Sequence, residues 1–111
     1  MRYPDFIKSF PGLDVPFPDD VVQIHAVRSD RGLVAFFDFL QDMVLPAHSH
    51  GAQWGTVLVG EIEFTIGGVI KKYGPGDTYS IPSGVVHSAH IAAGTKAIDV
   101  FEEPDRYQLK G

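Results

Sequence analysis

The sequence predicts one all-β domain, built as a small barrel or jelly roll. Two observations lead to this fold class. Short apolar segments recur at intervals of about 8–12 residues, and turns rich in glycine separate them. The length of 111 residues allows a single hydrophobic core, and eight Phe, four Tyr and one Trp supply rings to fill it. We therefore expect a single domain over residues 1–111.

The first twenty residues form an arm whose composition differs from the rest of the chain. Proline fixes φ and lacks a backbone N–H, so we expect extended chain and turns here rather than helix. An apolar arm of this kind packs across a sheet, either in its own barrel or in a partner's. We expect a homodimer with the arm in the contact. The prolines and aromatic residues of the arm are Tyr3, Pro4, Phe6, Phe10, Pro11, Pro16, Phe17 and Pro18.

Nine strands are expected in the barrel, which we place at residues 21–101. Gly67 and Gly68 predict a tight hairpin because both can adopt positive φ, and Gly60 predicts a bend. The polar tail, residues 102–111, has room for one helical turn. The expected strands cover 21–27, 33–40, 43–48, 54–59, 61–66, 69–73, 78–81, 85–92 and 95–101.

Composition excludes several classes of function. The net charge is −5 and the nine Lys and Arg are scattered, which argues against a nucleic-acid partner. No segment approaches the roughly 18 consecutive apolar residues of a membrane helix. Residues 1–5 do not resemble a signal peptide, so we expect a cytoplasmic protein. The absence of cysteine excludes disulfides, thiolate metal ligands and a cysteine nucleophile.

Three histidines predict a metal site inside the barrel. His48 and His50 are one residue apart, and alternate residues of a strand point to the same face. His87 comes from a distant strand. Three imidazole nitrogens leave coordination positions open for chemistry. We expect one divalent ion, which the ligand types leave open as Ni, Zn, Fe, Mn or Co. The alternative is that these imidazoles are hydrogen-bonded core residues.

The spacing of these histidines resembles the two signature motifs of the cupin superfamily. The first motif is His48-x-His50 followed by Gly60, and the second is Gly76-x5-Pro82-x-Gly84-x2-His87. The resemblance covers about residues 40–101. It implies a six- to nine-stranded antiparallel jelly roll with a metal in its mouth.

The resemblance also implies a fourth metal ligand, although its residue type departs from the family pattern. Cupins usually have a glutamate seven residues before the motif glycine, and Gln53 stands at that position here. Gln53 either coordinates the ion through its amide oxygen or hydrogen-bonds a ligand or water. With coordination, four neutral ligands would leave the full +2 charge on the ion. Such an ion favours a carboxylate or an enolate as its substrate group.

The last expected strand carries further candidates. Ala97, Asp99 and Phe101 share one face, and a carboxylate inside a barrel is costly unless it is paired, hydrated or used. This segment resembles the C-terminal segment of the small KdgF-type cupins, which linearise 4,5-unsaturated uronates. The resemblance implies that Asp99, Phe101 and Arg106 lie at the pocket. The alternatives are a rim position for Asp99 and, for Arg106, a surface pair with an acidic residue of the tail, namely Glu102, Glu103 or Asp105.

Three functions agree with these residues. The leading hypothesis is a metal-dependent enzyme that isomerises or ring-opens a small anionic carbohydrate or keto acid. In it Asp99 is the general acid or base, Phe101 walls the pocket and Arg106 clamps the substrate's carboxylate. The alternatives are an iron- or manganese-dependent dioxygenase and a non-catalytic, metal-containing ligand-binding module. By strand alternation, we expect His90 and Trp54 to face away from the site. His25 has no partner histidine in the sequence, so we expect it to be structural.

Overall fold

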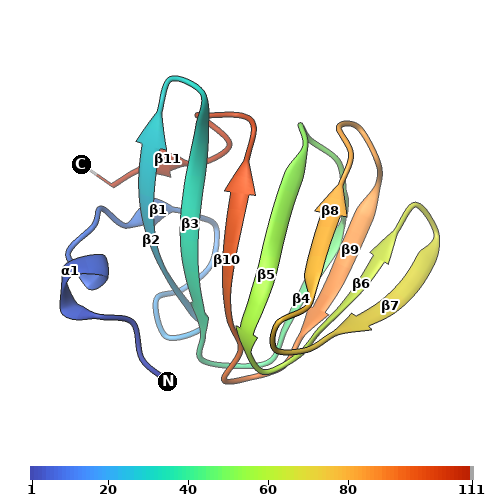
Figure 1. Cartoon of the computed structure of the whole chain (residues 1–111), viewed down its shortest axis with the longest axis horizontal. Coiled ribbons are helices and arrows are strands. Elements are labelled where there is room, and N and C mark those ends of the chain that lie inside the picture. The colour runs from blue at the N-terminus through green and yellow to red at the C-terminus, as the bar shows by residue number, and fades with distance from the viewer. Residues whose placement is uncertain (111) are drawn as a thin grey trace.

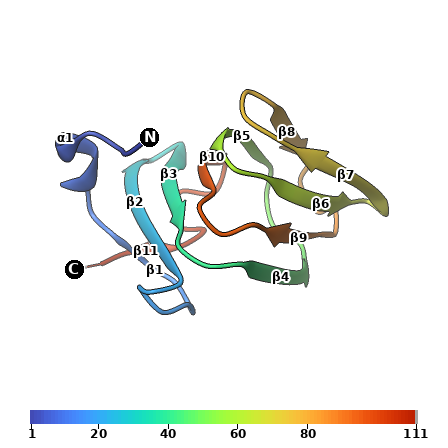
Figure 2. The same ribbon diagram turned by 90° about the horizontal axis from the view of Figure 1, so that it is seen from below.

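The computed structural model describes residues 1–110 as two facing antiparallel sheets (Figures 1 and 2). The five-stranded sheet has the order β2-β3-β10-β5-β8, and the four-stranded sheet has the order β4-β9-β6-β7. The nine predicted segments all form strands, with ends within two residues of those expected, so the all-β jelly roll is confirmed. The strands are β2 (Val22–Ser29), β3 (Gly32–Phe39), β4 (Met43–His48), β5 (Gln53–Val59), β6 (Ile62–Ile66), β7 (Val69–Tyr73), β8 (Thr78–Ile81), β9 (His87–Ile91) and β10 (Lys96–Phe101).

The core lies between the two sheets and follows the alternation of the strands. Along β3 the buried residues are Leu33, Ala35, Phe37 and Phe39, with less buried residues between them. The same period of two places every second residue of β10 inside. The hairpin between β6 and β7 forms at Gly67 and Gly68, whose φ angles are +55° and +83°. Strand alternation thus decides which side chains reach the interior.

The N-terminal arm departs from the prediction because it contains one helical turn, α1 (Asp5–Lys8). The carbonyl oxygen of Pro4 accepts hydrogen bonds from the backbone N–H groups of Ile7 and Lys8, at 3.0 and 3.1 Å. Pro4 lies just before the helix, where its missing N–H costs nothing. Asp5 in the first turn and Lys8 in the last also match the helix dipole. Proline therefore starts this turn rather than preventing it.

The arm packs on its own barrel. The Tyr3 side chain is buried, and its hydroxyl donates to the carbonyl oxygens of Phe37 at 2.8 Å and Ala97 at 3.2 Å. Its ring makes an edge contact with Phe36 on the outer side of β3. The expected homodimer stays a prediction, and a monomer mass by light scattering would refute it.

The C-terminal tail also differs from the prediction, since it forms a strand instead of a helical turn. The strands β1 (Leu13–Asp14) and β11 (Gln108–Leu109) form a separate two-stranded sheet. The backbone N–H of Lys110 donates to the carbonyl oxygen of Gly12 at 2.9 Å. Arm and tail therefore hold each other across one side of the barrel. Within residues 1–110, no helix has the length and apolar character needed to span a membrane.

Candidate metal centre

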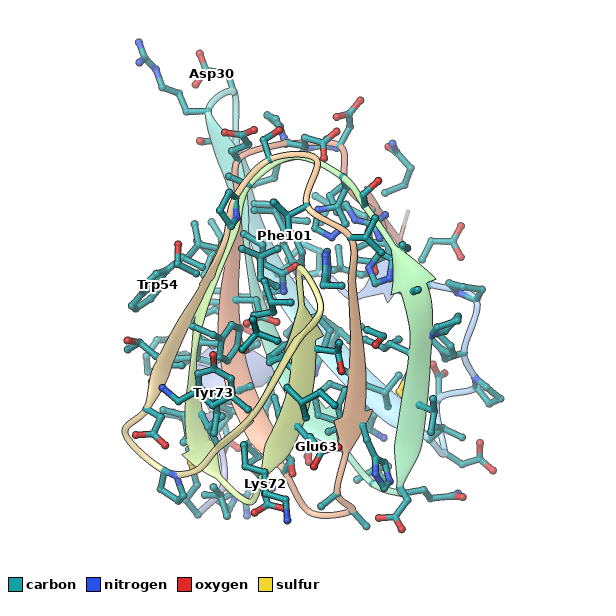
Figure 3. All side chains as sticks on the ribbon, turned by 90° about the vertical axis from the view of Figure 1, so that its right-hand side faces the viewer. Asp30, Trp54, Glu63, Lys72, Tyr73 and Phe101 are labelled. Atoms are coloured by element: carbon teal, nitrogen blue, oxygen red, sulfur yellow. The ribbon has the colours of Figure 1, made fainter. Side chains whose placement is uncertain are left out.

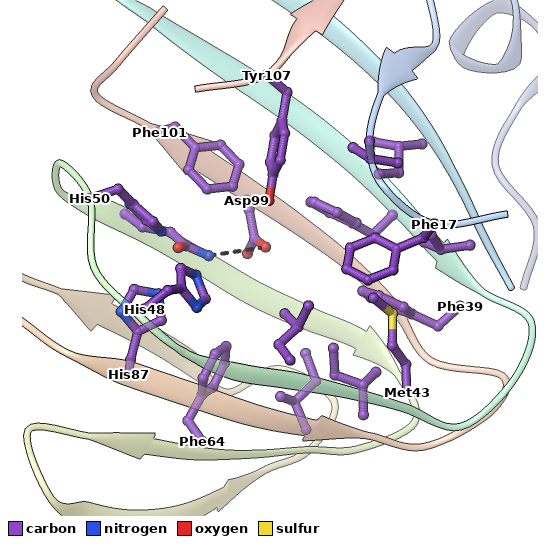
Figure 4. Close-up of a pocket in the computed structure, with 18 residues that line it drawn as sticks. Phe17, Phe39, Met43, His48, His50, Phe64, His87, Asp99, Phe101 and Tyr107 are labelled. Carbon is purple, nitrogen blue, oxygen red and sulfur yellow. Dashed lines mark hydrogen bonds between the residues drawn. The ribbon is translucent and has the colours of Figure 1, made fainter. Parts of the chain in front are cut away.

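The three predicted histidines meet inside one end of the barrel. His48 ends β4 and pairs with His87, the first residue of β9, while His50 lies in the loop before β5. One ring nitrogen from each lies within 4.8 Å of the others. Figure 4 shows the three rings turned toward a common point. Residues 37 positions apart in the sequence thus form one cluster.

The backbone fixes which nitrogen each ring offers. The Nδ1 atoms of His48, His50 and His87 lie 2.8, 2.7 and 3.0 Å from the carbonyl oxygens of Pro46, Gly51 and Val85, respectively. A carbonyl oxygen only accepts, so each Nδ1 carries the proton and donates it. In a neutral ring, Nε2 then has the free lone pair, as in metal-binding histidines whose second nitrogen donates to the protein.

The electrostatics of the cluster favour neutral rings. Burial lowers the pKa of both His50 and His87 below the usual value, and the positive charge of Arg106 lowers them further. A neutral imidazole is the form that binds a metal ion. Orientation and protonation therefore agree for a site with three nitrogen donors.

Gln53 extends this donor set. It begins β5, is buried, and lines the same pocket as the histidines. Its amide nitrogen donates a hydrogen bond to Asp99 Oδ2 at 3.3 Å. Because the nitrogen is used in this bond, the amide oxygen remains available for another partner. Three imidazole nitrogens and one amide oxygen suit the mid-row divalent ions Zn, Ni, Fe, Mn and Co. Both roles predicted for Gln53, ligand to the ion or hydrogen-bond partner of a ligand, are compatible with this geometry.

Asp99 lies inside the barrel beside Gln53. Its carboxyl group accepts hydrogen bonds from the Tyr79 hydroxyl and from the Gln53 amide. These side-chain partners replace the backbone contacts expected of a rim residue. Burial raises the pKa of Asp99 to about 7, although both hydrogen bonds act in the opposite direction. The structure thus holds Asp99 as a buried, oriented carboxyl group at the pocket.

A glycine makes room for this carboxyl group. Across the five-stranded sheet Asp99 pairs with Gly55, and Gly55 pairs with Tyr79. A Cβ at Gly55 would collide with Asp99 Oδ1 and with the Tyr79 ring. The glycine therefore lets Tyr79 reach across a strand to Asp99. Our sequence reasoning missed Tyr79, although alternation along residues 78–81 points it inward with Ile81.

The two other predicted pocket residues lie in different settings. Phe101 is buried, lines the pocket and makes an edge contact with the His50 ring, at 5.8 Å between centroids. The Arg106 guanidinium stacks on the ring of Tyr107, 4.3 Å from its centroid, and does not line the pocket. Within residues 1–110, Arg106 Nε is buried without a hydrogen-bond partner, and no ion pair joins Arg106 to Glu102, Glu103 or Asp105. Tyr107, which the sequence reasoning did not select, lines the pocket.

The loop that carries His50 is held from two sides. The carbonyl oxygen of Gly51 accepts the hydrogen bond from His50 Nδ1, and the backbone N–H of Gly51 donates to Glu103 Oε1 of the tail at 2.6 Å. On the opposite side, the N–H of Gly84 donates to the carbonyl oxygen of His50 at 2.8 Å. The tail and the second motif loop thus position this ligand together.

The residues predicted to lie outside the site do so. His90 is exposed on the outer side of β9, and Trp54 is 46% exposed and points away from the barrel (Figure 3). His25 Nδ1 lies 3.0 Å from the carbonyl oxygen of Phe10, which is a structural contact with the arm.

The cluster opens into a pocket with a cavity volume of about 50 Å³. Among residues 1–110, the polar side chains that line it are those of the cluster, Gln53, Asp99 and Tyr107. The remainder of the lining is apolar and comes from the arm and from both sheets. These apolar residues are Val15, Phe17, Val22, Ile24, Phe37, Phe39, Met43, Leu45, Ile62, Phe64, Ile91 and Phe101.

Several solved structures are similar to this chain. KdgF from a Halomonas species is 23% identical, with a TM-score of 0.73, over 88% of this chain and 94% of that one. An RmlC-like cupin from Shewanella frigidimarina is 24% identical, with a TM-score of 0.75, over 89% and 87% of the two chains. Oxalate decarboxylase from Bacillus subtilis, which has Mn(II) centres, is 20% identical with a TM-score of 0.71, but the match spans 29% of its chain. These similarities show the fold.

Sequence comparison gives the family. No curated protein matches the chain in a sequence search. A family model described as the cupin domain matches residues 41–101, more than half of the chain, and includes all three histidines. With the jelly roll and the two motifs, this match shows that the chain belongs to the cupin family.

Proposed function

We propose that this cupin is a metal-dependent enzyme that transfers a proton on a small carboxylate substrate, a keto acid or an anionic carbohydrate. The observation that carries the proposal is the set of three Nδ1 hydrogen bonds to backbone carbonyls. They leave the three Nε2 atoms free, and the three rings line one pocket together with a buried carboxyl group. A hydrogen-bonded core would not need three converging imidazoles there.

His48, His50 and His87, together with the Gln53 amide oxygen, are the residues that would hold one divalent ion. When bound, such an ion supplies Lewis-acid stabilisation of negative charge that develops on a substrate oxygen. The Mn(II) centres of the structurally similar oxalate decarboxylase support this choice of cofactor class. The neutral donor set leaves the charge of the ion uncompensated, which favours an anionic substrate.

Asp99 is the proposed general acid and base. Its carboxylate takes a proton from the carbon beside the substrate carbonyl and returns it to another atom, so the isomerisation leaves atoms and electrons balanced. Tyr79 and Gln53 orient the two carboxyl oxygens. Phe101 forms the wall beside His50. Arg106 stacks on Tyr107 outside the pocket lining, and we propose that its guanidinium turns toward the pocket to hold the substrate's carboxylate.

Hydrogen exchange on a simple keto acid tests this function. The metal-loaded protein is incubated with 2-oxobutanoate in D₂O, and the loss of the C3 proton signal is followed by NMR. We expect Asp99→Asn to slow the exchange by about 100-fold or more, whereas Asp30→Asn, in the exposed β2–β3 turn, serves as the control and retains it. An Asp99→Asn variant that exchanges at the full rate would remove Asp99 from this role.

The alternatives give different results in parallel assays. Oxygen consumption by the Fe(II)-loaded protein with the same keto acid would identify a dioxygenase instead. Binding of the acid by calorimetry without exchange or oxygen uptake would identify a ligand-binding module.

A further inference from the structure

The pocket continues from the metal centre into an apolar chamber. In Figure 4, Phe17, Phe39 and Met43 lie at the end of the pocket opposite the three histidines. Phe39 and Met43 are buried core residues, and Phe17 is half-buried and packs against the core from the arm. Tyr107 and Asp99 lie between the two ends in the same view. The pocket is therefore polar at one end and apolar at the other.

Three separate segments build the apolar chamber. The arm contributes Val15 and Phe17, the end of β3 contributes Phe39, and β4 contributes Met43 and Leu45. Four of these five side chains have no hydrogen-bonding atom, and the thioether sulfur of Met43 is only a weak acceptor. Among residues 1–110, the polar side chains that line the pocket lie at the histidine-bearing end or, in the case of Asp99 and Tyr107, between the two ends.

The apolar end of the pocket distinguishes between the two substrate classes of the proposed function, a keto acid and an anionic carbohydrate. A sugar acid carries several hydroxyl groups, and burying a hydroxyl without a hydrogen bond is unfavourable. An aryl or alkyl substituent has no such groups and gains from leaving water. The chamber thus favours a ligand whose anionic head lies at the histidines and whose other end is apolar.

We infer that the ligand of this pocket is a 2-oxo carboxylate with an aryl or branched alkyl substituent, and not a sugar acid. The inference rests on the proposed function, because it assumes that the carboxylate end of the ligand lies at the metal. It adds the recognition of the other end, by Phe17, Leu45 and Met43.

Three acids with the same head group test the inference by calorimetry with the Zn(II)-loaded protein. They are 2-oxobutanoate, 2-oxo-4-phenylbutanoate, which adds a phenyl ring, and 2-oxo-3-deoxygluconate, which adds hydroxylated carbons. We expect the phenyl acid to bind about tenfold or more tightly than 2-oxobutanoate, because the ring is buried in the chamber. The hydroxylated acid is expected to bind no more tightly than 2-oxobutanoate.

Two variants locate the added affinity. Phe17→Ala is expected to remove most of the advantage that the phenyl acid has over 2-oxobutanoate. Phe6→Ala is the matched control, since Phe6 lies on the same arm but is 66% exposed and outside the pocket. Leu45→Asn changes a chamber residue on strand β4 and is expected to have the same effect as Phe17→Ala. Using both variants keeps the test informative if one of them folds poorly.

The outcomes separate this inference from the proposed function. Equal affinities for the phenyl acid and 2-oxobutanoate, or tightest binding of the hydroxylated acid, overturn the inference and leave carboxylate binding at the metal intact. If none of the three acids binds to the loaded protein, the proposed function fails and the inference fails with it. If the phenyl acid still binds more tightly than 2-oxobutanoate in both Phe17→Ala and Leu45→Asn, the phenyl ring binds outside the chamber. That result also overturns the inference.

Discussion

The two ends of the pocket are built in different ways. At the metal end, each imidazole is held by a backbone carbonyl no more than two residues away in the sequence. At the apolar end, Phe17, Phe39 and Met43 come from the arm and from strands of different sheets, and their contacts form only when the whole chain folds. The difference indicates that local structure orients the chemistry, whereas long-range packing sets stability and the shape of the cavity.

The largest expected effect is at the metal end. We expect His87→Ala to weaken Zn(II) binding by more than about 100-fold, because loss of a ligand exceeds the usual effect of losing one of its supporting hydrogen bonds. His90→Ala is the matched control, since His90 lies on the same strand but faces solvent. Competition with a chromophoric chelator measures both affinities. Equal weakening in the two variants would show that the effect is not specific to the cluster.

At the apolar end, a truncation should affect folding and leave the metal in place. Met43 is buried, so we expect Met43→Ala to lower the free energy of unfolding by about 2–5 kcal/mol. The same variant should bind one metal ion with the affinity of the wild type. Urea denaturation and chelator competition test the two halves. Loss of metal binding in a folded Met43→Ala protein would contradict the separation between the two ends.

Gly55 tests the region where the two ends meet. A Cβ there would displace Asp99 or Tyr79, so we expect Gly55→Ala to destabilise the fold by about 1–3 kcal/mol. Gly74→Ala is the control, because a Cβ at Gly74 would meet its nearest atom, Asp77 Oδ2, only at 4.0 Å. Thermal denaturation of both variants gives the comparison. If the two substitutions are equally tolerated, close packing around Asp99 is not needed for stability.

The smallest expected effect comes from the support of His50. Glu103→Ala removes the acceptor of the Gly51 N–H, and we expect metal affinity to fall by about tenfold at most. Glu102→Ala provides the control, because the Glu102 side chain is exposed and it is Glu103 that accepts the hydrogen bond from the Gly51 N–H. Affinities are again measured by chelator competition. An unchanged affinity in Glu103→Ala would mean that the loop holds His50 without the tail.

The sequence predicted the metal end because its information is local. His48 and His87 face each other across the paired strands β4 and β9, as the motif spacing predicts. The expectation that His50 shares a strand face with His48 was wrong, because β4 ends at His48 and His50 is oriented by the loop, through the carbonyl oxygen of Gly51. The inward positions of Asp99 and Phe101 follow from the period of two along a strand. Even the outward direction of Trp54 and His90 could be predicted in this way.

Long-range contacts account for what the sequence did not predict. The β1–β11 pair joins residues from opposite ends of the chain. The helical turn at residues 5–8 is the local exception, and it depends on Pro4 as a hydrogen-bond acceptor. Tyr79 reaches Asp99 only because Gly55 separates them on the intervening strand. Phe17 becomes part of the pocket only when the arm folds back on the barrel. None of these contacts has a periodic signal in the sequence.

We propose that the three histidines hold one divalent ion. The most direct test is the metal content, by mass spectrometry, of protein purified without added metal, measured beside the His48→Ala/His50→Ala variant. We expect about one divalent ion per chain in the wild type and none in a folded variant. The proposal is contradicted if the wild-type protein contains no metal and binds none when divalent ions are added, or if the variant has the same metal content as the wild type.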